Sequence, residues 1–166
     1  MILIGLGSNL DSERHGSPVA TLTAALEALP AMRVSVAARS SWYRSEPVPP
    51  SGQPWYVNGV AALATDLEPA ALLEALLSVE AAFGRVRSVR NAARVLDLDL
   101  LDYNGRVLQS ASLTLPHPRL HERRFVLAPL CELAPAWVHP TLGKTAAELL
   151  ARLSSADRIE PLAVAG

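Results

Sequence analysis

The amino-acid sequence predicts a single α+β domain, residues 1–166, with a mainly antiparallel sheet. Three observations support this class. Stretches of alternating or continuous apolar residues, typical of strands, are interspersed with stretches whose apolar residues recur every three or four positions, typical of helices. Two expected strands follow each other with no helix between them, which an antiparallel pair permits. A chain of 166 residues is long enough for one sizeable core and short for two.

The first half of the chain predicts three strands and one helix. Residues 1–8 predict a buried strand with a tight exit, because Leu10 stands where a dinucleotide-binding motif would need its third glycine. A helix is predicted over residues 18–29, since proline is tolerated in a first turn. Residues 32–44 predict one long strand from their β-branched and aromatic content, and residues 55–65 predict another after a Pro- and Gly-rich loop.

The middle of the chain predicts a helix and a hairpin. Residues 68–83 have helical apolar spacing and end at Gly84. Residues 95–103 predict a strand, and Asn104-Gly105 predicts a hairpin turn into residues 106–108.

The last third of the chain predicts a loop and two helices. After the loop at residues 114–119, a helix is predicted over residues 119–133 with a break at Pro129, and a final helix over residues 145–153. Gly143-Lys144-Thr145 resembles the tail of a P-loop, but the first glycine of that motif would fall on Val138, so we expect a turn. The order strand, helix, strand, strand, helix, strand with a short accessory hairpin is that of a ferredoxin-like sandwich, with helices on one or both faces.

The strand at residues 95–100 alternates Val or Leu with Asp. Successive side chains of a strand point to opposite faces, so Asp97 and Asp99 share one face. Two carboxylates at this spacing suit Mg²⁺, especially where substrate phosphates supply further oxygen ligands. The alternative interpretation is an amphipathic edge strand with a solvated acidic face.

Charge is balanced over the chain and unbalanced locally. There are 15 Lys and Arg against 16 Asp and Glu, which argues against a protein that coats nucleic acid. Between residues 85 and 124, however, eight Arg face four acids, which favours a small polyanionic ligand. One cysteine excludes an internal disulfide, and no signal segment or 18-residue apolar run is present, so we expect a cytoplasmic protein without a membrane partner.

Tyr56 and Asn58 share a face of the strand predicted at residues 55–65. They have two possible roles: cross-strand packing, or a stacking surface beside an amide that hydrogen-bonds the edge of a heterocycle. Glu80 falls near the end of its predicted helix, where an acid is unfavourable, which hints at another role.

Six short motifs follow one another along the chain. They are Gly7-Ser8-Asn9-Leu10, residues 41–47 (Ser-Trp-Tyr-Arg-Ser-Glu-Pro), residues 53–58 (Gln-Pro-Trp-Tyr-Val-Asn), residues 84–87 (Gly-Arg-Val-Arg), residues 94–99 (Arg-Val-Leu-Asp-Leu-Asp) and residues 115–119 (Leu-Pro-His-Pro-Arg). In this order the motifs resemble the 6-hydroxymethyl-7,8-dihydropterin pyrophosphokinase family of folate biosynthesis, and the resemblance runs nearly end to end.

The resemblance implies a ferredoxin-like enzyme that moves the β,γ-pyrophosphoryl group of ATP to the pterin's hydroxymethyl oxygen and releases AMP. It implies that Asp97 and Asp99 hold two Mg²⁺ ions. The pterin would stack between Tyr56 and Phe125, with Asn58, Ser45 and Glu46 beside it. ATP and its phosphates would contact Glu80, Arg85, Arg87, Arg94, His117 and Arg123, with Arg87 and Arg94 also catalytic. No nucleic acid is implied, and we expect a monomer.

The chain departs from the family's pattern just before Arg94. Many members have Trp-Gly-Pro there, whereas this chain has Asn91-Ala92-Ala93 and is one residue shorter. We expect the arginine-rich residues 85–94 to form a lid over bound ATP, because like charges repel until a triphosphate neutralises them.

Two other functions remain open from the sequence. Another Mg-dependent Asp-x-Asp nucleotidyl or glycosyl transferase would need the same acids and arginines, and product analysis would separate it. A non-catalytic nucleotide-binding module would bind ATP without turnover.

Overall fold

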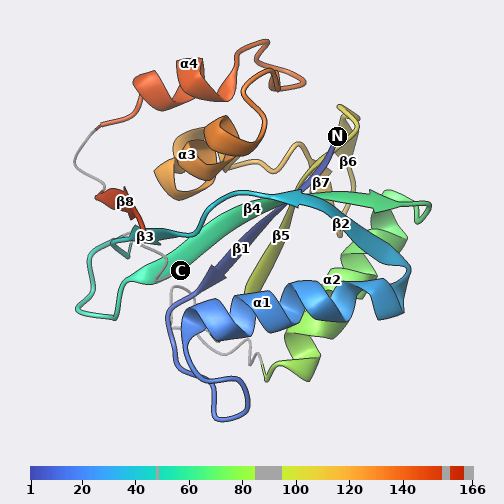
Figure 1. Cartoon of the computed structure of the whole chain (residues 1–166). Coiled ribbons are helices and arrows are strands. Elements are labelled where there is room, and N and C mark those ends of the chain that lie inside the picture. The colour runs from blue at the N-terminus through green and yellow to red at the C-terminus, as the bar shows by residue number, and fades with distance from the viewer. Residues whose placement is uncertain (48, 85–94, 155–157, 163–166) are drawn as a thin grey trace.

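A six-stranded antiparallel sheet organises the computed structural model, which describes residues 1–47, 49–84, 95–154 and 158–162. The strands follow the order β5-β1-β4-β3-β8, and β2 also pairs with β4 (Figure 1). Every pairing in this sheet is antiparallel. The strands are β1 (Ile2–Ser8), β2 (Val34–Arg39), β3 (Tyr43–Ser45), β4 (Tyr56–Thr65), β5 (Asp97–Tyr103) and β8 (Ile159–Pro161).

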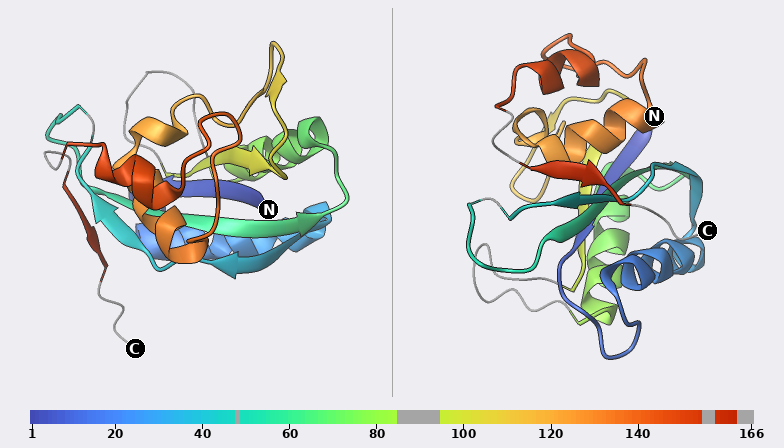
Figure 2. Two further views of the ribbon diagram at one scale, coloured as in Figure 1. Left: turned by 90° about the horizontal axis from the view of Figure 1, so that it is seen from above. Right: turned by 60° about the vertical axis from the view of Figure 1, so that its left-hand side comes forward.

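Helices cover both faces of the sheet (Figures 1 and 2). On one face lie α1 (Pro18–Ala28) and α2 (Pro69–Ala82), and on the other lie α3 (Arg124–Leu133) and α4 (Ala146–Ala151). Short 3-10 turns precede β2 at Leu29–Met32 and α3 at Leu120–Glu122. This architecture confirms the predicted ferredoxin-like α+β fold. Within the described ranges, no helix has the length and apolar character required to cross a bilayer.

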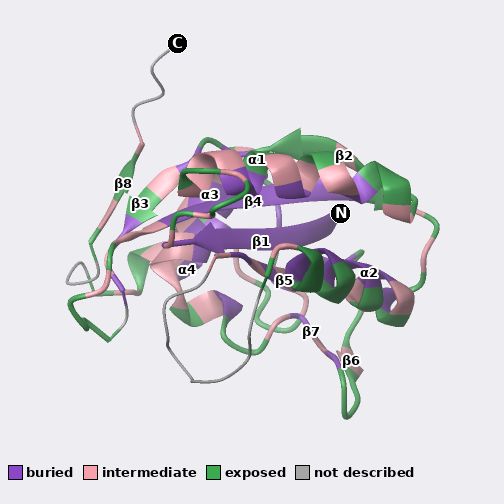
Figure 3. Ribbon diagram, turned by 90° about the horizontal axis from the view of Figure 1, so that it is seen from below, coloured by how far each residue is buried: buried purple, intermediate pink, exposed green. Residues whose placement is uncertain are grey.

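The two faces of β1 and β4 build two separate cores. Ile4 and Leu6 belong to the core beneath α1 and α2, whereas Leu3 and Val60 belong to the core beneath α3 and α4. Strand alternation sets this division, and burial of both faces makes β1 and β4 the most enclosed strands (Figure 3). Gly5 and Gly7 follow Leu3 on the α3 face of β1, so that face carries no side chain toward the end of the strand.

The prediction of one long strand over residues 32–44 was wrong. The segment forms β2 and β3, separated at residues 40–42. The hydroxyl oxygen of Ser40 accepts a hydrogen bond from Val60 N–H at 3.0 Å, and Trp42 turns its indole into the core. A Cβ at Gly59 would lie 2.6 Å from the Trp42 ring, so the strand break depends on a glycine on β4.

The strand pairing predicted for the hairpin at Asn104-Gly105 was also wrong. The turn forms, with positive φ at both residues and a 3.0 Å bond from Arg106 N–H to the Tyr103 carbonyl. However, β6 (Leu108–Gln109) pairs with β7 (Thr114–Leu115) rather than with β5. The accessory hairpin therefore lies one segment later than predicted, and it includes residues expected in a loop.

The helix predicted over residues 119–133 breaks at a different residue. Arg123 has an extended backbone, with φ −113° and ψ 106°, and it separates the 3-10 turn from α3. Pro129 is buried inside α3, and its missing N–H removes one bond, to the carbonyl of Phe125. The break places Arg123 at the N-terminal end of α3.

Candidate functional site

A cavity of about 300 Å³ lies on the α3 face of the sheet, over the glycines of β1. Gly7 pairs with Asn58 of β4 on one side and with Asp97 of β5 on the other, and Gly5 pairs with Asp99. Directly opposed residues of an antiparallel pair share a face, so all these positions face the cavity. The glycines give the cavity a floor of main-chain atoms.

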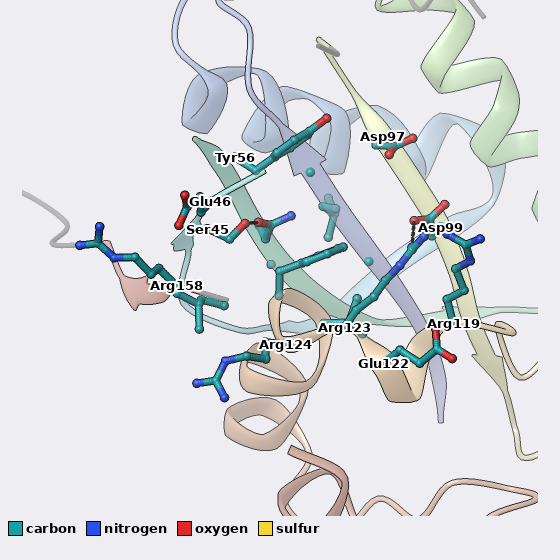
Figure 4. A pocket seen from close by; sticks show the side chains of 18 residues that line it. Ser45, Glu46, Tyr56, Asp97, Asp99, Arg119, Glu122, Arg123, Arg124 and Arg158 are labelled. Atoms are coloured by element: carbon teal, nitrogen blue, oxygen red, sulfur yellow. Dashed lines mark hydrogen bonds and ion pairs between the residues drawn. The ribbon is translucent and has the colours of Figure 1, made fainter. Parts of the chain in front are cut away.

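Two carboxylates stand on one side of this floor. Asp97 and Asp99 both line the cavity and are half-buried, and Figure 4 shows them on the same strand. The Arg123 guanidinium lies 3.7 Å from Asp99 Oδ2. The glycines opposite these acids carry no side chain, so space is left in front of both carboxylates. Two oxygen donors with open space fit Mg²⁺, which usually keeps several ligands from water and phosphates.

The described residues contain no group of three or more His, Cys, Asp and Glu side chains arranged to hold a metal ion. A cation bound at Asp97 and Asp99 would therefore take most of its ligands from outside these residues. This donor set resembles a nucleotide-dependent magnesium site more than a closed structural metal site.

The opposite side of the cavity carries aromatic and amide groups. Tyr56 at the start of β4 and Phe125 in the first turn of α3 both line it, together with Glu46. The buried Ser45 hydroxyl donates a hydrogen bond to Asn58 Oδ1. Because that bond occupies the amide oxygen, Asn58 Nδ2 is directed toward Gly7, where an added Cβ would lie only 3.1 Å from it. The amide therefore presents a donor beside the floor.

His117 lies next to the cavity without lining it. Its Nδ1 accepts a hydrogen bond from Arg119 N–H at 3.1 Å, so a neutral ring carries its proton on Nε2. Burial, followed by the charges of Arg123 and Arg119, lowers the pKa of His117 from 6.5 to about 4, with Asp97 acting in the opposite direction. The ring is therefore a neutral N–H donor near pH 7.

Glu80 lies on the other face of the sheet, away from the cavity. Its side chain is 2% exposed, and its Oε2 accepts a hydrogen bond from Leu98 N–H at 2.8 Å. Leu98 stands between the two acids of β5. The expected contact between Glu80 and ATP stays a prediction, and the structure adds a role in fixing β5.

The remaining residues expected to contact ATP lie outside the described residues. These are Arg85, Arg87 and Arg94, and the expected lid and the Asn91-Ala92-Ala93 departure lie there too.

Several groups at the cavity were given no role from the sequence. Arg119, Glu122 and Arg124 come from the turn before α3 and its first residue. Ile159 is the first residue of the C-terminal strand, and Arg158 directly precedes it. The cluster of arginines between residues 85 and 124 gave a clue to the residues near α3. Nothing in the sequence indicated Arg158 and Ile159. The motif residue Asn9 is buried, and it donates to Gln53 Oε1 and to the Pro54 carbonyl, both at 3.1 Å, which ties the exit of β1 to the loop before Tyr56.

Residues 3–135 match the family model described as 7,8-dihydro-6-hydroxymethylpterin-pyrophosphokinase (HPPK), which is more than half of the chain. The chain belongs to the HPPK family. An HPPK relative from Synechocystis sp., named 2-amino-4-hydroxy-6-hydroxymethyldihydropteridine pyrophosphokinase, is 43% identical over 149 residues, which are 89% of this chain and 73% of the relative. A relative of the same name from Methylorubrum extorquens is 44% identical over 160 residues, covering 95% of this chain and 97% of its own.

A solved HPPK-DHPS structure shares the fold. The Plasmodium falciparum HPPK-DHPS, wild type with pteroate, superposes with a TM-score of 0.69 over 90% of this chain at 12% sequence identity. This chain spans 43% of that solved chain, and the similarity supports the fold alone.

Proposed function

We propose that this HPPK-family chain transfers the β,γ-pyrophosphoryl group of ATP to the hydroxymethyl oxygen of 6-hydroxymethyl-7,8-dihydropterin, a step of folate biosynthesis. The observation that carries the proposal is one cavity with two chemically different sides. Two carboxylates and an arginine stand on one side, and two aromatic residues and an oriented amide stand on the other. The first set suits a polyphosphate, and the second suits a flat heterocycle.

The heterocycle side would bind the pterin. Tyr56 and Phe125 offer rings for stacking, which gives aromatic pairs roughly 0.5–1.5 kcal/mol beyond the burial of area. Asn58 Nδ2 would donate to an acceptor on the ring edge, since Ser45 already occupies the amide oxygen. The carboxylate of Glu46 would accept from ring N–H groups. These groups would point the hydroxymethyl arm toward Asp97 and Asp99.

The phosphate side would hold MgATP, with Asp97 and Asp99 as the protein's ligands for two Mg²⁺ ions. Bound Mg²⁺ would neutralise charge that develops on the transferring phosphoryl oxygens. Arg123, already 3.7 Å from Asp99, would form charge-assisted hydrogen bonds to a phosphate. The neutral His117 would donate from Nε2 without adding charge. Arg85, Arg87, Arg94 and Glu80 complete the proposed ATP contacts.

The reaction needs no nucleophilic side chain. The pterin hydroxyl oxygen forms a bond to the β-phosphorus of ATP, the bond from that phosphorus to the α,β-bridging oxygen breaks, and AMP leaves with that oxygen. The hydroxyl proton passes in the same step to the Asp97 carboxylate or to water. The protein's contribution is to align the two oxygens and to stabilise the charge between them.

Product analysis tests the proposal. The protein is mixed with MgATP and the hydroxymethyl dihydropterin, with Asp97→Ala as the inactive control, and the nucleotides are separated. Release of AMP that depends on the pterin is expected. Release of ADP or free pyrophosphate instead would indicate another Asp-x-Asp transferase, and ATP binding without turnover would indicate a binding module.

A further inference from the structure

The C-terminal strand β8 lies beyond the residues that match the HPPK family model and forms the edge of the sheet next to β3. Its backbone holds β3 at both ends. Glu46 N–H donates to the Arg158 carbonyl at 3.0 Å, and Leu162 N–H donates to the Trp42 carbonyl at 2.9 Å. Residues in an antiparallel pair alternate between bonded and non-bonded positions, so Arg44 and Glu160 form the bonded pair at the centre.

The proline of this strand stands at a position that does not bond to β3. Pro161 lies opposite Tyr43, one residue beyond Glu160 and therefore at a non-bonded position. Its missing N–H removes no hydrogen bond to β3, and proline at a sheet edge also discourages pairing with another chain.

Side chains add a second connection between β8 and the site. Arg44 Nη1 lies 3.1 Å from Glu160 Oε1. The guanidinium carbons of Arg44 and Arg158 lie 5.0 Å and 5.1 Å from the centre of the Trp55 ring, and Trp55 directly precedes Tyr56. These contacts are exposed and individually weak, but all of them act on the two strands that meet at Ser45 and Tyr56.

The strand that β8 holds carries the heterocycle side of the cavity. Ser45 is the last residue of β3, it pairs with Tyr56 on one side and with Ile159 on the other, and its hydroxyl fixes the amide of Asn58. Arg158 and Ile159 themselves line the cavity. Figure 4 shows Arg158 on the side of Ser45 and Glu46, away from Asp97 and Asp99.

We propose that β8 is a positioning strand for the pterin side of the site. The inference rests on the proposed function. Without β8, the three residues of β3 would be an edge strand with one partner, followed directly by a loop. Ser45 would then lose its fixed position, and the amide of Asn58 would lose the bond that sets its direction. The carboxylates of β5 lie on the far side of β1 and β4. We therefore expect the binding of MgATP to change little when β8 is displaced.

A pair of variants at one position tests this role in the full chain. Glu160→Pro removes the central N–H of the β8 ladder, and Glu160→Thr removes the same carboxylate while keeping the N–H and a good strand residue. For Glu160→Pro we expect the KM for the pterin to rise about tenfold, with the KM for ATP and kcat within about twofold of wild type. For Glu160→Thr we expect all three constants within about twofold. An unchanged pterin KM in Glu160→Pro, or an equal rise in both KM values, would overturn the proposal.

A charge exchange gives a second test that does not depend on proline being tolerated. Glu160→Arg places two arginines opposite each other and is expected to raise the pterin KM about threefold, and adding Arg44→Glu is expected to restore it. Equal pterin KM values in the single and double variants would count against β8 as a positioning strand. Failure of the proposed function has a different result, because wild type itself would then release no pterin-dependent AMP.

Discussion

The carboxylate of Glu80 accepts a hydrogen bond from the backbone N–H of Leu98 at 2.8 Å, on the opposite face of the sheet from the acids that flank Leu98. β5 is the last strand on its side of the sheet, so this bond satisfies a backbone group that β1 does not reach. The position of Asp97 and Asp99 therefore depends partly on a buried acid behind them.

We expect Glu80→Leu to destabilise the protein and to lower kcat, because the Leu98 N–H is left without its acceptor. An unsatisfied buried group costs about 1–3 kcal/mol. Glu80→Gln retains an oxygen acceptor and should lose less stability, while removing the charge. Urea unfolding measures the stability and AMP release measures kcat. Equal stability of wild type and Glu80→Leu would contradict this role.

Asp97→Ala and Asp99→Ala should each remove nearly all turnover while leaving the free energy of unfolding close to wild type. Both side chains are half-buried in an open cavity, so neither contributes much to the core. Loss of a metal ligand at the site of developing charge is worth several kcal/mol of barrier. Retention of more than about a tenth of wild-type kcat, a loss below about 1.4 kcal/mol, would refute the assignment.

Tyr56→Ala and Phe125→Ala should weaken pterin binding far more than MgATP binding, because the stacking surface is lost while the phosphate contacts stay. Titration calorimetry with each ligand separately measures the difference. Leu22→Ala, in the core beneath α1 and remote from the cavity, is a control for loss of packing alone. Equal loss of affinity for both ligands in the Tyr56 and Phe125 variants would show that these rings serve the core.

The floor of the cavity gives a matched pair of glycine variants. A Cβ on Gly7 would lie 3.1 Å from Asn58 Nδ2, whereas the nearest atom to a Cβ on Gly5 is a Leu101 methyl at 3.6 Å, an ordinary contact. Gly7→Ala should therefore turn the Asn58 amide and raise the pterin KM more than Gly5→Ala does. Steady-state kinetics of the two variants is the measurement, and a larger pterin KM for Gly5→Ala would contradict the geometry.

His117 should titrate near pH 4 in the free protein, and MgATP should raise its pKa, since phosphate charge favours the imidazolium form. The folded pKa lies below the unfolded value of about 6.5, so the unfolded state binds more protons in this window. Stability from neutral His117 is thus present above pH 6.5 and lost as the pH falls toward 4. Solvent exposure limits the effect to about 1–2 kcal/mol.

NMR titration of the imidazole resonances measures the His117 pKa directly. Urea unfolding at pH 7 and pH 4.5 should show a smaller pH dependence for His117→Gln than for wild type. Burial also lowers the pKa of His139, but that residue is present in both proteins and its contribution cancels in the comparison.

Local sequence patterns predicted the elements that alternate strongly and missed those set by distant partners. The alternation of Leu and Asp in β5 predicted which face Asp97 and Asp99 share, because side-chain direction in a strand is a local property. The Asn104-Gly105 turn was also predicted, but its strand partner was not, because pairing of Leu108 with Leu115 depends on contacts that turn residues do not encode.

The C-terminal strand illustrates the same limit at the site. Ile159-Glu160-Pro161 is short and contains a proline, so no pattern within it predicts a strand, and its pairing with β3 spans more than a hundred residues. Arg158 and Ile159 could therefore be assigned to the candidate site only from the structure. Tyr56 and Asn58 were predicted to share a face, and the family resemblance implied that Ser45 lies beside the pterin, but the bond from Ser45 to the Asn58 amide was identified from the structure.

The glycine floor has a consequence for inhibition. A compound bound against β1 at Gly5 and Gly7 would touch main-chain atoms. Substitutions at other positions do not change the chemical identity of these atoms. Resistance at this surface would require a new side chain on one of the two glycines, and that side chain would protrude into the space in which the natural substrates must meet. A glycine substitution that prevents the compound from binding would thus also hinder binding of the natural substrates.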